Sequence, residues 1–300
     1  MIYLITGSNG LLGQKILKRL TDDNIQVIAT SKGSNRNKKN VLYSYESLDI
    51  TDEKEVVRVL NHYKPDIVFN TAAMTNVDLC EDKKDLCDSL NIRSVNYLAD
   101  SCLKIDAHLI HISTDFIFDG NDGPYSEDDP PNPLSYYGES KYKSEKLLIA
   151  HACKSTILRT IVLFGVADNL TKSNIVLWAK EQLENNNKIN IIDDEYRAPT
   201  LAEDLAEACI VVAQNKAFGV FHISGKDLMS IYDLVVNIAN FFKFDVNLIN
   251  RINSKALNQK AKRPPKTGFV LDKAKYILNF TPHTFIESLE IIDKQLNIKT

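Results

Sequence analysis

A tyrosine and a lysine four residues apart, Tyr137 and Lys141, are the side chains of this sequence best suited to acid/base chemistry. Residues at this spacing lie one above the other on a single face of a helix. A nearby ammonium group favours the phenolate form of a tyrosine, so the pair could transfer protons nearer neutral pH than a free tyrosine can. The same spacing also arises where a half-buried ring lies beside a solvated lysine, so the residues upstream have to decide between the two.

The chain begins with a short apolar run that leads into a glycine-rich turn. Residues 2–5 are too few for a helix and end close to Gly7, which predicts a buried parallel strand. Gly7 permits a tight turn, Gly10 lets the backbone approach a pyrophosphate, and Gly13 lets the next helix pack close to the strand. The N-terminus of that helix would offer its N–H groups to phosphates. The spacing differs from Gly-x-Gly-x-x-Gly, and a plain strand-to-helix turn is the alternative.

The end of the second predicted strand, at residues 26–30, bears on the choice of dinucleotide. An NAD-selective site often has Asp or Glu here, which accepts a hydrogen bond from the ribose 2′-hydroxyl. This chain has Ser31, Lys32 and Arg36 instead, and hydroxyls and cations suit the 2′-phosphate of NADP. A solvated basic loop is the alternative.

Further residues that could line a dinucleotide site follow other predicted strands. Asp49 and Ile50 are placed to flank an adenine, and the small Ala72 and Ala73 would let the chain pass close to a cofactor. Strands alternate with helices through five units, which predicts an α/β fold with a doubly wound parallel sheet. Ligands of such sheets bind beyond the carboxyl ends of the strands. The glycine turn, Asp49, Ala72 and Thr114 all stand at those ends.

Composition and charge narrow the class of protein. Three hundred residues predict one large domain or two closely joined domains. A hydrophobic fraction of 44% and a charged fraction of 25% are typical of a soluble globular protein. The formal net charge of -3 gives no electrostatic reason to expect nucleic acid or an anionic membrane as partner.

The five cysteines lack paired spacing, which fits a reducing compartment. Cys80 and Cys87 are isolated from other soft ligands, so we expect buried thiols and no metal site. No signal-peptide pattern follows Met1, and no apolar run approaches membrane-spanning length. We therefore expect a cytoplasmic protein.

Taken together, the glycine turn, the threonine after the fifth strand and the Tyr137–Lys141 pair resemble an extended short-chain dehydrogenase/reductase. Finer similarity to the dTDP-4-dehydrorhamnose reductases lies in the segments 70–78, 113–120, 124–127 and 133–141. The resemblance covers essentially the whole chain. It implies an NADP-binding Rossmann domain over residues 1–165, to which part of 201–225 returns. A smaller, interleaved C-terminal substrate domain would take up most of 166–300.

The resemblance also implies roles for single residues. Thr114, Tyr137 and Lys141 match the catalytic triad of the family, whereas Tyr136 does not, because Ser140 stands four residues after it. Asp115 matches a sugar contact. Family cofactor contacts fall on Leu11, Leu12, Ala72, Ala73, Met74 and Ile112.

The second half of the chain carries one further resemblance to the family, at Arg263, and differs from it at Arg197 and Val162. Arg197 stands where a glycine is often found, and could hold a diphosphate or be a solvated arginine. Arg263 belongs to a C-terminal Arg-Pro segment and is a candidate contact for the nucleotide diphosphate. Val162 replaces a tryptophan found in many rhamnose-pathway reductases, which leaves the shape of the sugar pocket open. His222 lies in an apolar strand, and we expect a core histidine there.

The resemblance implies NADPH-dependent reduction of a nucleotide-linked 4-keto-6-deoxy sugar, most specifically dTDP-4-dehydro-L-rhamnose to dTDP-L-rhamnose. NADP(H) is the expected cofactor and NAD(H) the alternative. A nucleotide-sugar epimerase would use the same triad. A non-catalytic NADP-binding regulatory subunit is a third reading, since the regulatory subunit of methionine adenosyltransferase resembles this family too. A nucleotide sugar is the expected partner, and a homodimer is left open.

Overall fold

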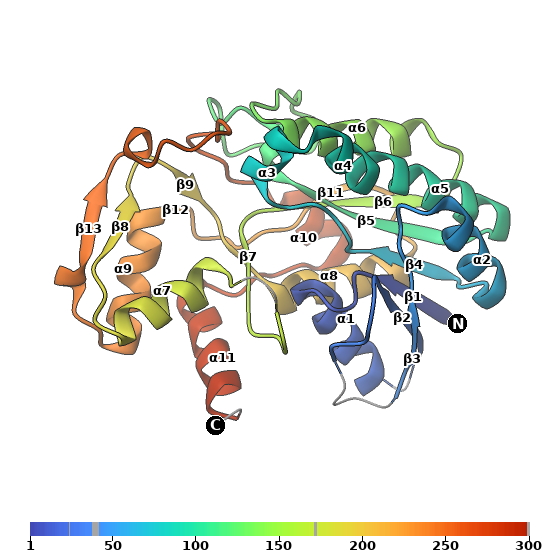
Figure 1. The fold of residues 1–300 in the computed structure, drawn as a ribbon, viewed down its shortest axis with the longest axis horizontal. Coiled ribbons are helices and arrows are strands. Elements are labelled where there is room, and N and C mark those ends of the chain that lie inside the picture. The colour runs from blue at the N-terminus through green and yellow to red at the C-terminus, as the bar shows by residue number, and fades with distance from the viewer. Residues whose placement is uncertain (24, 38–41, 171–172, 299–300) are drawn as a thin grey trace.

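The computed structural model describes residues 1–23, 25–37, 42–170 and 173–298. Its centre is a sheet of seven strands in the order β11-β6-β5-β4-β1-β2-β3 (Figure 1). The strands are β1 (Ile2–Thr6), β2 (Gln26–Ser31), β3 (Ser44–Ser47), β4 (Ile67–Asn70), β5 (His108–Thr114), β6 (Ser155–Thr160) and β11 (Gly219–His222). Every neighbouring pair is parallel. Strand order reverses between β1 and β4, so the sheet is doubly wound, as predicted.

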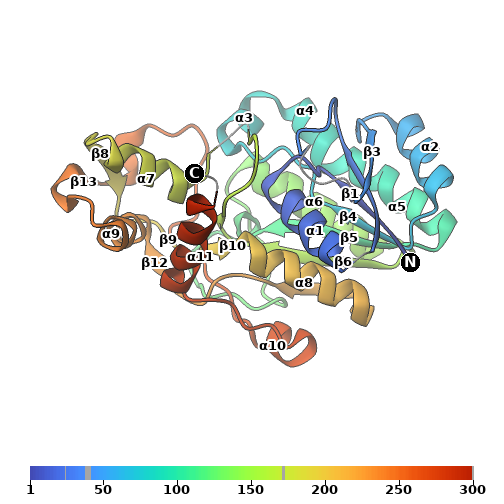
Figure 2. The ribbon, with the colours of Figure 1, turned by 90° about the horizontal axis from the view of Figure 1, so that it is seen from below.

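Helices cover both faces of this sheet. They include α1 (Leu11–Asp22), α2 (Glu53–Tyr63), α5 (Ser94–Ile105), α6 (Tyr136–Ala150) and α8 (Ala202–Asn215). Tyr3 and Ile5 pack in one core with α1 and α8, while Leu4 packs in a second core with α2, α5 and α6. Figures 1 and 2 show these two layers of helices on opposite sides of the sheet. Burial on both faces is the reason that the strands read as nearly continuous apolar runs.

The helical region over residues 84–105 contains one irregularity. It follows α3 (Val77–Asp82) and consists of α4 (Lys84–Asp88), the π-helical turn η1 (Ser89–Arg93) and α5. The π turn was not foreseen, and it brings the buried side chain of Asn91 toward the site. None of the helices in the described ranges is long and apolar enough to span a membrane.

A further hydrophobic core lies beside the sheet, at the left of Figure 1. It is built mainly from α7 (Ile175–Glu184), β8 (Ile189–Ile192), α9 (Ile231–Phe242), β13 (Ile249–Ile252) and α11 (Phe285–Asn297). Shorter elements of this half are β7 (Leu163–Phe164), β9 (Tyr196–Arg197), β10 (Thr200–Leu201), β12 (Met229–Ser230), η3 (Val246–Leu248), η4 (Ser254–Leu257) and α10 (Asp272–Leu278). Between them the chain returns to the sheet through α8 and β11. The expected domain boundary near residue 165 stays a prediction.

The sixth strand ends earlier than the sequence suggests. Apolar residues continue from Ile161 to Phe164, but β6 stops at Thr160 and the separate β7 pairs with β10. Val162 lies between them with a φ of 39°, which is incompatible with a strand and unusual for a β-branched residue. The Thr200 hydroxyl donates to the carbonyl of Ile161 at 2.7 Å, so a contact from a distant segment stabilises the break.

Candidate active site

The glycine turn after β1 has the geometry of a phosphate-binding turn. Gly7 has a φ of +70°, and a Cβ there would lie 2.8 Å from the backbone nitrogen of Ala72. Only glycine fits such a close approach at a positive φ. Helix α1 begins after Gly10, and no side chain caps its N-terminus. Its first N–H groups are therefore available to an anion, and this cradle would accept the pyrophosphate of a dinucleotide.

Asn9, within this turn, holds the basic loop that follows β2. Its side-chain amide donates to the carbonyl of Ser34 at 3.0 Å and accepts from the backbone N–H of Arg36 at 2.9 Å. The structure thus brings Arg36 next to the glycine turn, although sequence reasoning did not single out Asn9. An asparagine in a glycine-rich turn is the signal that could have pointed to it.

Lys32 and Asp49, two of the predicted cofactor residues, form an ion pair with 2.6 Å between Nζ and Oδ2. Burial raises the pKa of Asp49, but Lys32 and Thr51 outweigh this and the net shift is downward. The Lys32 side chain is 80% exposed, so a phosphate could still approach it. Asp49 would then share the lysine with that phosphate.

The remaining predicted cofactor residues lie at the same edge of the sheet or beside it. Ser31 ends β2 and Ile112 lies near the end of β5, each partly exposed. Leu11, Ala72 and Ala73 are also partly exposed, while Leu12, Ile50 and Met74 are buried.

Close packing of α6 against the segment after β5 brings the predicted triad together. Ser135 caps the helix by accepting from the backbone N–H of Gly138 at 3.2 Å. A Cβ on Gly138 would lie 2.1 Å from the carbonyl oxygen of Phe116, so only glycine permits this approach. The Tyr137 hydroxyl consequently reaches the hydroxyl of Thr114, with which it forms a hydrogen bond.

The pKa of Tyr137 does not follow the sequence expectation. Burial raises it well above the ordinary value for tyrosine, and the hydrogen bond with Thr114 offsets this only in part. We expected Lys141 to lower it, and that prediction is wrong for this structure. A raised pKa keeps the phenol protonated, which suits a proton donor better than a base.

Lys141 is 2% exposed, and its Nζ lies 2.9 Å from Nε2 of His111 in β5. Burial lowers the pKa of Lys141 to about 8, against an opposing effect of Glu145. His111 also contacts Asn70 at the end of β4, with 3.1 Å between Nδ1 and the amide, and Ser144 at 3.2 Å. A polar chain of buried side chains therefore lies beneath the candidate site.

Tyr136 faces elsewhere, as expected. Its hydroxyl donates to Asp88 at 2.9 Å, and its backbone N–H donates to Glu81 at 2.7 Å. Burial and the nearby Asp88 carboxylate raise the pKa of Tyr136 to about 12.

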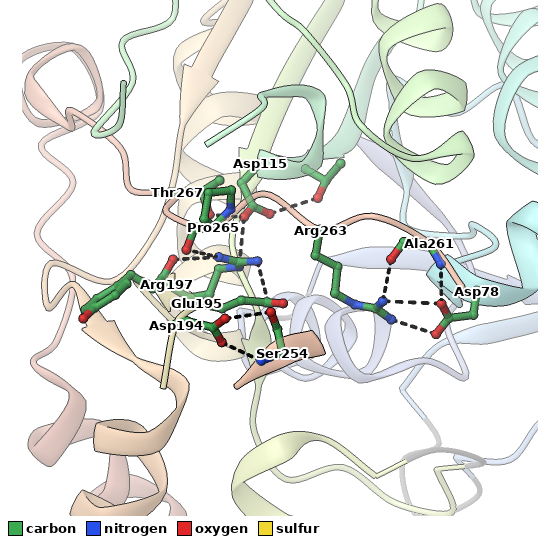
Figure 3. Close-up of polar contacts among 12 residues, drawn as sticks. Asp78, Asp115, Asp194, Glu195, Arg197, Ser254, Ala261, Arg263, Pro265 and Thr267 are labelled. Carbon is green, nitrogen blue, oxygen red and sulfur yellow. Dashed lines mark hydrogen bonds and ion pairs between the residues drawn. The ribbon is translucent and has the colours of Figure 1, made fainter. Parts of the chain in front are cut away.

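Arg197 and Asp115 lie in one buried cluster (Figure 3). The guanidinium donates to Glu195 at 2.9 Å, and its Nε lies 3.8 Å from Oδ2 of Asp115. Asp115 accepts hydrogen bonds from Thr267 and, at 3.1 Å, from Thr114. Because Arg197 is only 2% exposed, it is not a solvated arginine. A diphosphate could reach it only by displacing a carboxylate, so the structure favours a structural role over the predicted contact.

Arg263 lies beside this cluster (Figure 3) and is less buried than Arg197. It donates to both oxygens of Asp78, at 2.7 and 3.4 Å, and its side chain is 15% exposed. The backbone N–H of Ala261 donates to Asp78 as well, and Lys260 pairs with Asp82. The arginine lowers the pKa of Asp78. These contacts fasten the C-terminal segment to α3.

The expectation for His222 is confirmed. The side chain is fully buried between the carbonyl of Tyr125 and the guanidinium of Arg159, each at 3.1 Å. Burial lowers its pKa to about 2, so it stays neutral. Cys80 and Cys87 are buried too, in a small cluster with Met74 against Tyr136 and Tyr137.

Sequence reasoning missed two buried polar residues at the site. His111 lies buried within β5, and its polarity within an apolar strand is the signal that could have identified it. Asn91 donates to the carbonyl of Met74 and to Ser140, and accepts from the backbone N–H of Met74. It holds the chain after β4 against α6, a role that nothing in the local sequence indicates.

Comparison with known proteins gives a consistent picture. The family model described as "RmlD substrate binding domain" matches residues 1–297. A dTDP-4-dehydrorhamnose reductase of Aggregatibacter actinomycetemcomitans is 31% identical over 96% of this chain and 97% of its own. The structure of a Bacillus anthracis dTDP-4-dehydrorhamnose reductase, a complex with NADP, has a TM-score of 0.86 at 25% identity, covering 98% and 99%. Methionine adenosyltransferase 2 subunit beta of Bos taurus is 30% identical over 80% of this chain and 71% of its own.

The match of the family model, the reductase relative and the shared fold agree with the triad geometry at the sheet edge. The chain belongs to the dTDP-4-dehydrorhamnose reductase (RmlD) family of NAD(P)-dependent oxidoreductases.

Proposed function

We propose that the protein reduces the keto group of a nucleotide-linked 4-keto-6-deoxy sugar with NADPH. The most specific candidate is conversion of dTDP-4-dehydro-L-rhamnose to dTDP-L-rhamnose, the substrate class named by the reductase relatives. The observation that carries the proposal is the contact between Tyr137 and Thr114 at the carboxyl end of β5. A protonated phenol beside a second hydroxyl at this edge fits proton donation to a reduced carbonyl.

Several features support NADP(H) as the cofactor. The uncapped N-terminus of α1 and the close approach at Gly7 would accept its pyrophosphate. Ser31, Lys32 and Arg36 would hold the 2′-phosphate, and Asp49 with Ile50 would flank the adenine. NADPH supplies a hydride to the carbonyl carbon when bound. NAD(H) stays the alternative, since Lys32 already has Asp49 as a counter-ion.

The residues of the chain would then have separate tasks. Tyr137 donates its phenolic proton to the carbonyl oxygen as negative charge develops there. Thr114 holds the hydroxyl of Tyr137 and lies next to the same oxygen. Lys141 would hold the cofactor ribose through its ammonium group. Since the pKa of Tyr137 is raised by burial, the phenol is protonated at the start of each cycle.

Substrate contacts are proposed at the edge where the C-terminal segment meets α3. Arg263 would contact the nucleotide diphosphate, with Asp78 as the carboxylate that the diphosphate replaces. Asp115 would act on the sugar through Thr114, because its two oxygens are held by Thr114 and Thr267. Arg197 would neutralise Asp115 from behind.

The similarity to methionine adenosyltransferase 2 subunit beta supports a second candidate function, that of an NADP-binding regulatory subunit. Such a subunit would bind NADP and turn over no sugar. An epimerase, the alternative with the same triad, would interconvert two sugars with no net use of cofactor. All five cysteines are buried thiols, which supports a reducing compartment and hence our proposal of a cytoplasmic location.

One experiment separates these functions. Purified protein is incubated with dTDP-4-dehydro-L-rhamnose and NADPH, NADPH absorbance is followed, and the product is weighed by mass spectrometry. If the protein is a reductase, the sugar gains two hydrogens for each NADPH consumed. Interconversion without NADPH loss indicates an epimerase. Binding of NADP without turnover on a panel of 4-keto nucleotide sugars would reject the reductase and favour the regulatory subunit.

A further inference from the structure

Lys141 has an unusual environment for a cation. Its side chain is 2% exposed, and the hydrogen bond recorded for its Nζ goes to His111 at 2.9 Å. Glu145, one turn further along α6, forms a buried ion pair with Arg159 at 2.8 Å. That carboxylate is thus already neutralised by another cation. The position of the ammonium group therefore depends on the imidazole.

The tautomer of His111 follows from this contact. At pH 7 most Lys141 is an ammonium, since its pKa is about 8, and an ammonium has only donors. Burial and Lys141 hold the pKa of His111 well below its usual range, so the ring is neutral. Nε2 must then be the unprotonated nitrogen that accepts from Lys141. The single ring proton is left on Nδ1.

This proton sets the orientation of Asn70. In the structure, the amide nitrogen of Asn70 lies 3.1 Å from Nδ1 of His111, and the amide oxygen accepts from Oγ1 of Thr6 at 2.7 Å. A proton on Nδ1 requires these two amide atoms to be exchanged. Amide oxygen and nitrogen are assigned from the hydrogen-bond network, so the carbonyl oxygen belongs on the side of His111. The amide nitrogen then donates to Thr6, the residue just before Gly7. One directed chain runs from the ammonium of Lys141 to the start of the glycine turn.

We propose that His111 is a positioning residue for Lys141, holding its ammonium group at the candidate site through Nε2, with Asn70 fixing the ring tautomer. The proposal rests on the reductase function proposed above, in which Lys141 holds the cofactor ribose. A hydrogen bond accepted from the charged form of a group stabilises that form. His111 therefore keeps Lys141 protonated to a higher pH than burial alone would allow. The other titratable groups facing Lys141 are Glu145 and Cys87.

Two variants at position 111 test this role. One lacks a hydrogen-bond acceptor for Lys141, and the other keeps one. His111→Leu should move the basic limb of the kcat profile down by about one pH unit, the shift expected for one lost hydrogen bond to a charge. His111→Gln keeps an amide oxygen near Nε2 and should restore most of that shift. NADPH affinity at pH 6 serves as the check that both variants are folded. A folded His111→Leu enzyme with an unmoved basic limb would overturn the proposal.

The wild-type protein provides a measurement that needs neither a variant nor turnover. Nitrogen-15 NMR of the histidine rings should show His111 as the Nδ1–H tautomer at pH 7, with Nε2 unprotonated. The Nζ resonance of Lys141, assigned with Lys141→Met, should titrate near pH 8. An Nε2–H tautomer would reject the proposal whether or not the protein reduces a sugar. Absence of sugar turnover together with the Nδ1–H tautomer would count against the proposed function alone.

Discussion

Arg197 of β9 and Asp115, just after β5, form a fully buried ion pair across 3.8 Å, although they lie far apart in the sequence (Figure 3). Glu195 is a second carboxylate on the same guanidinium, at 2.9 Å. The ring of Phe116 lies 5.7 Å from the guanidinium carbon, which adds a cation–π contact. One arginine thus compensates two carboxylates directly behind Thr114.

Replacing Arg197 by methionine should strongly destabilise the protein. The substitution keeps most of the volume but leaves Asp115 and Glu195 without a cation, and breaking a buried pair in this way costs about 3–5 kcal/mol. Burial already raises the pKa of both carboxyls, and loss of Arg197 would raise both further. The folded variant would then bind more protons than the unfolded chain, so its stability should fall as pH rises. Urea denaturation at pH 5.5 and 8 measures both effects.

Arg251 provides the matched control for that experiment. It also pairs with an aspartate, Asp193 at 3.6 Å, and stacks on Tyr232 at 4.3 Å, but its side chain is 59% exposed. Arg251→Met should change the free energy of unfolding by no more than about 1 kcal/mol. Equal losses in the two variants would show that burial of the Arg197 cluster is not what matters.

Tyr137→Phe should retain the fold and cofactor binding and lose most of the reductase activity. General acid catalysis typically contributes ~10²–10⁴-fold, and the phenylalanine ring still packs against Phe116. Tyr136→Phe is the control, since that hydroxyl bonds to Asp88 and faces away from Thr114. Steady-state turnover of both variants tests the assignment. A Tyr137→Phe enzyme near wild-type turnover would refute it.

The parts of the fold that were predictable depend on short-range patterns. Apolar runs of four or five residues followed by glycine or small polar residues gave the strands, and glycine spacing gave the turn at Gly7. The same local logic failed at Val162, where the strand ends because Thr200, from a distant segment, bonds to the backbone. A sequence window around residue 162 contains no sign of that contact.

In the candidate site, too, the features set by local sequence were predictable and those set by long-range contacts were not. Thr114, Tyr137 and Lys141 could be named in advance because they follow predicted strand ends or share a helix face. The pKa of Tyr137 could not be predicted from the sequence, because burial by residues distant in the sequence raises it. Arg197 likewise reads as a loop arginine until the fold places Asp115 beside it. Burial and long-range pairing, rather than residue type, decide those roles.

A preference for NADPH over NADH is the third prediction. Each charge-assisted hydrogen bond to the 2′-phosphate is worth roughly 1.5–3 kcal/mol, so two contacts would give a preference on the order of a hundredfold. The contribution of Lys32 to this preference is smaller, because Lys32 must share its ammonium group between Asp49 and the phosphate. Lys32→Ala should reduce the ratio of the two dissociation constants measured by calorimetry, whereas Lys154→Ala, remote from the site, should not. Equal affinity of the wild type for both cofactors would reject the assignment.

Acid should destabilise the fold through His108. Burial lowers the pKa of His108 to about 4, with a smaller contribution from Lys154. Between pH 6.5 and 4 the unfolded chain binds a proton there and the folded chain does not, so stability falls as pH decreases through that window. His108→Gln should remove up to about 2 kcal/mol of the loss between pH 7 and 5. Urea denaturation at the two pH values measures this, and an unchanged pH dependence would contradict it.

Replacing Arg263 should weaken binding of the sugar nucleotide without slowing the chemical step. The guanidinium lies at the seam between the C-terminal segment and α3, and only one carboxylate, Asp78, is recorded as its ion-pair partner within the described part of the chain. If a diphosphate takes the place of Asp78, Arg263→Met should raise the KM for the sugar nucleotide by about tenfold or more. The kcat should stay within about twofold, because the contact is made equally in the ground and transition states. Lys260→Met is the control, since that lysine pairs with Asp82 nearby and is more than half exposed. Steady-state kinetics on both variants separate the effects. An unchanged KM in Arg263→Met would mean that Arg263 only fastens the C-terminal segment to α3. In that case the variant should lose stability and keep its affinity for the sugar nucleotide.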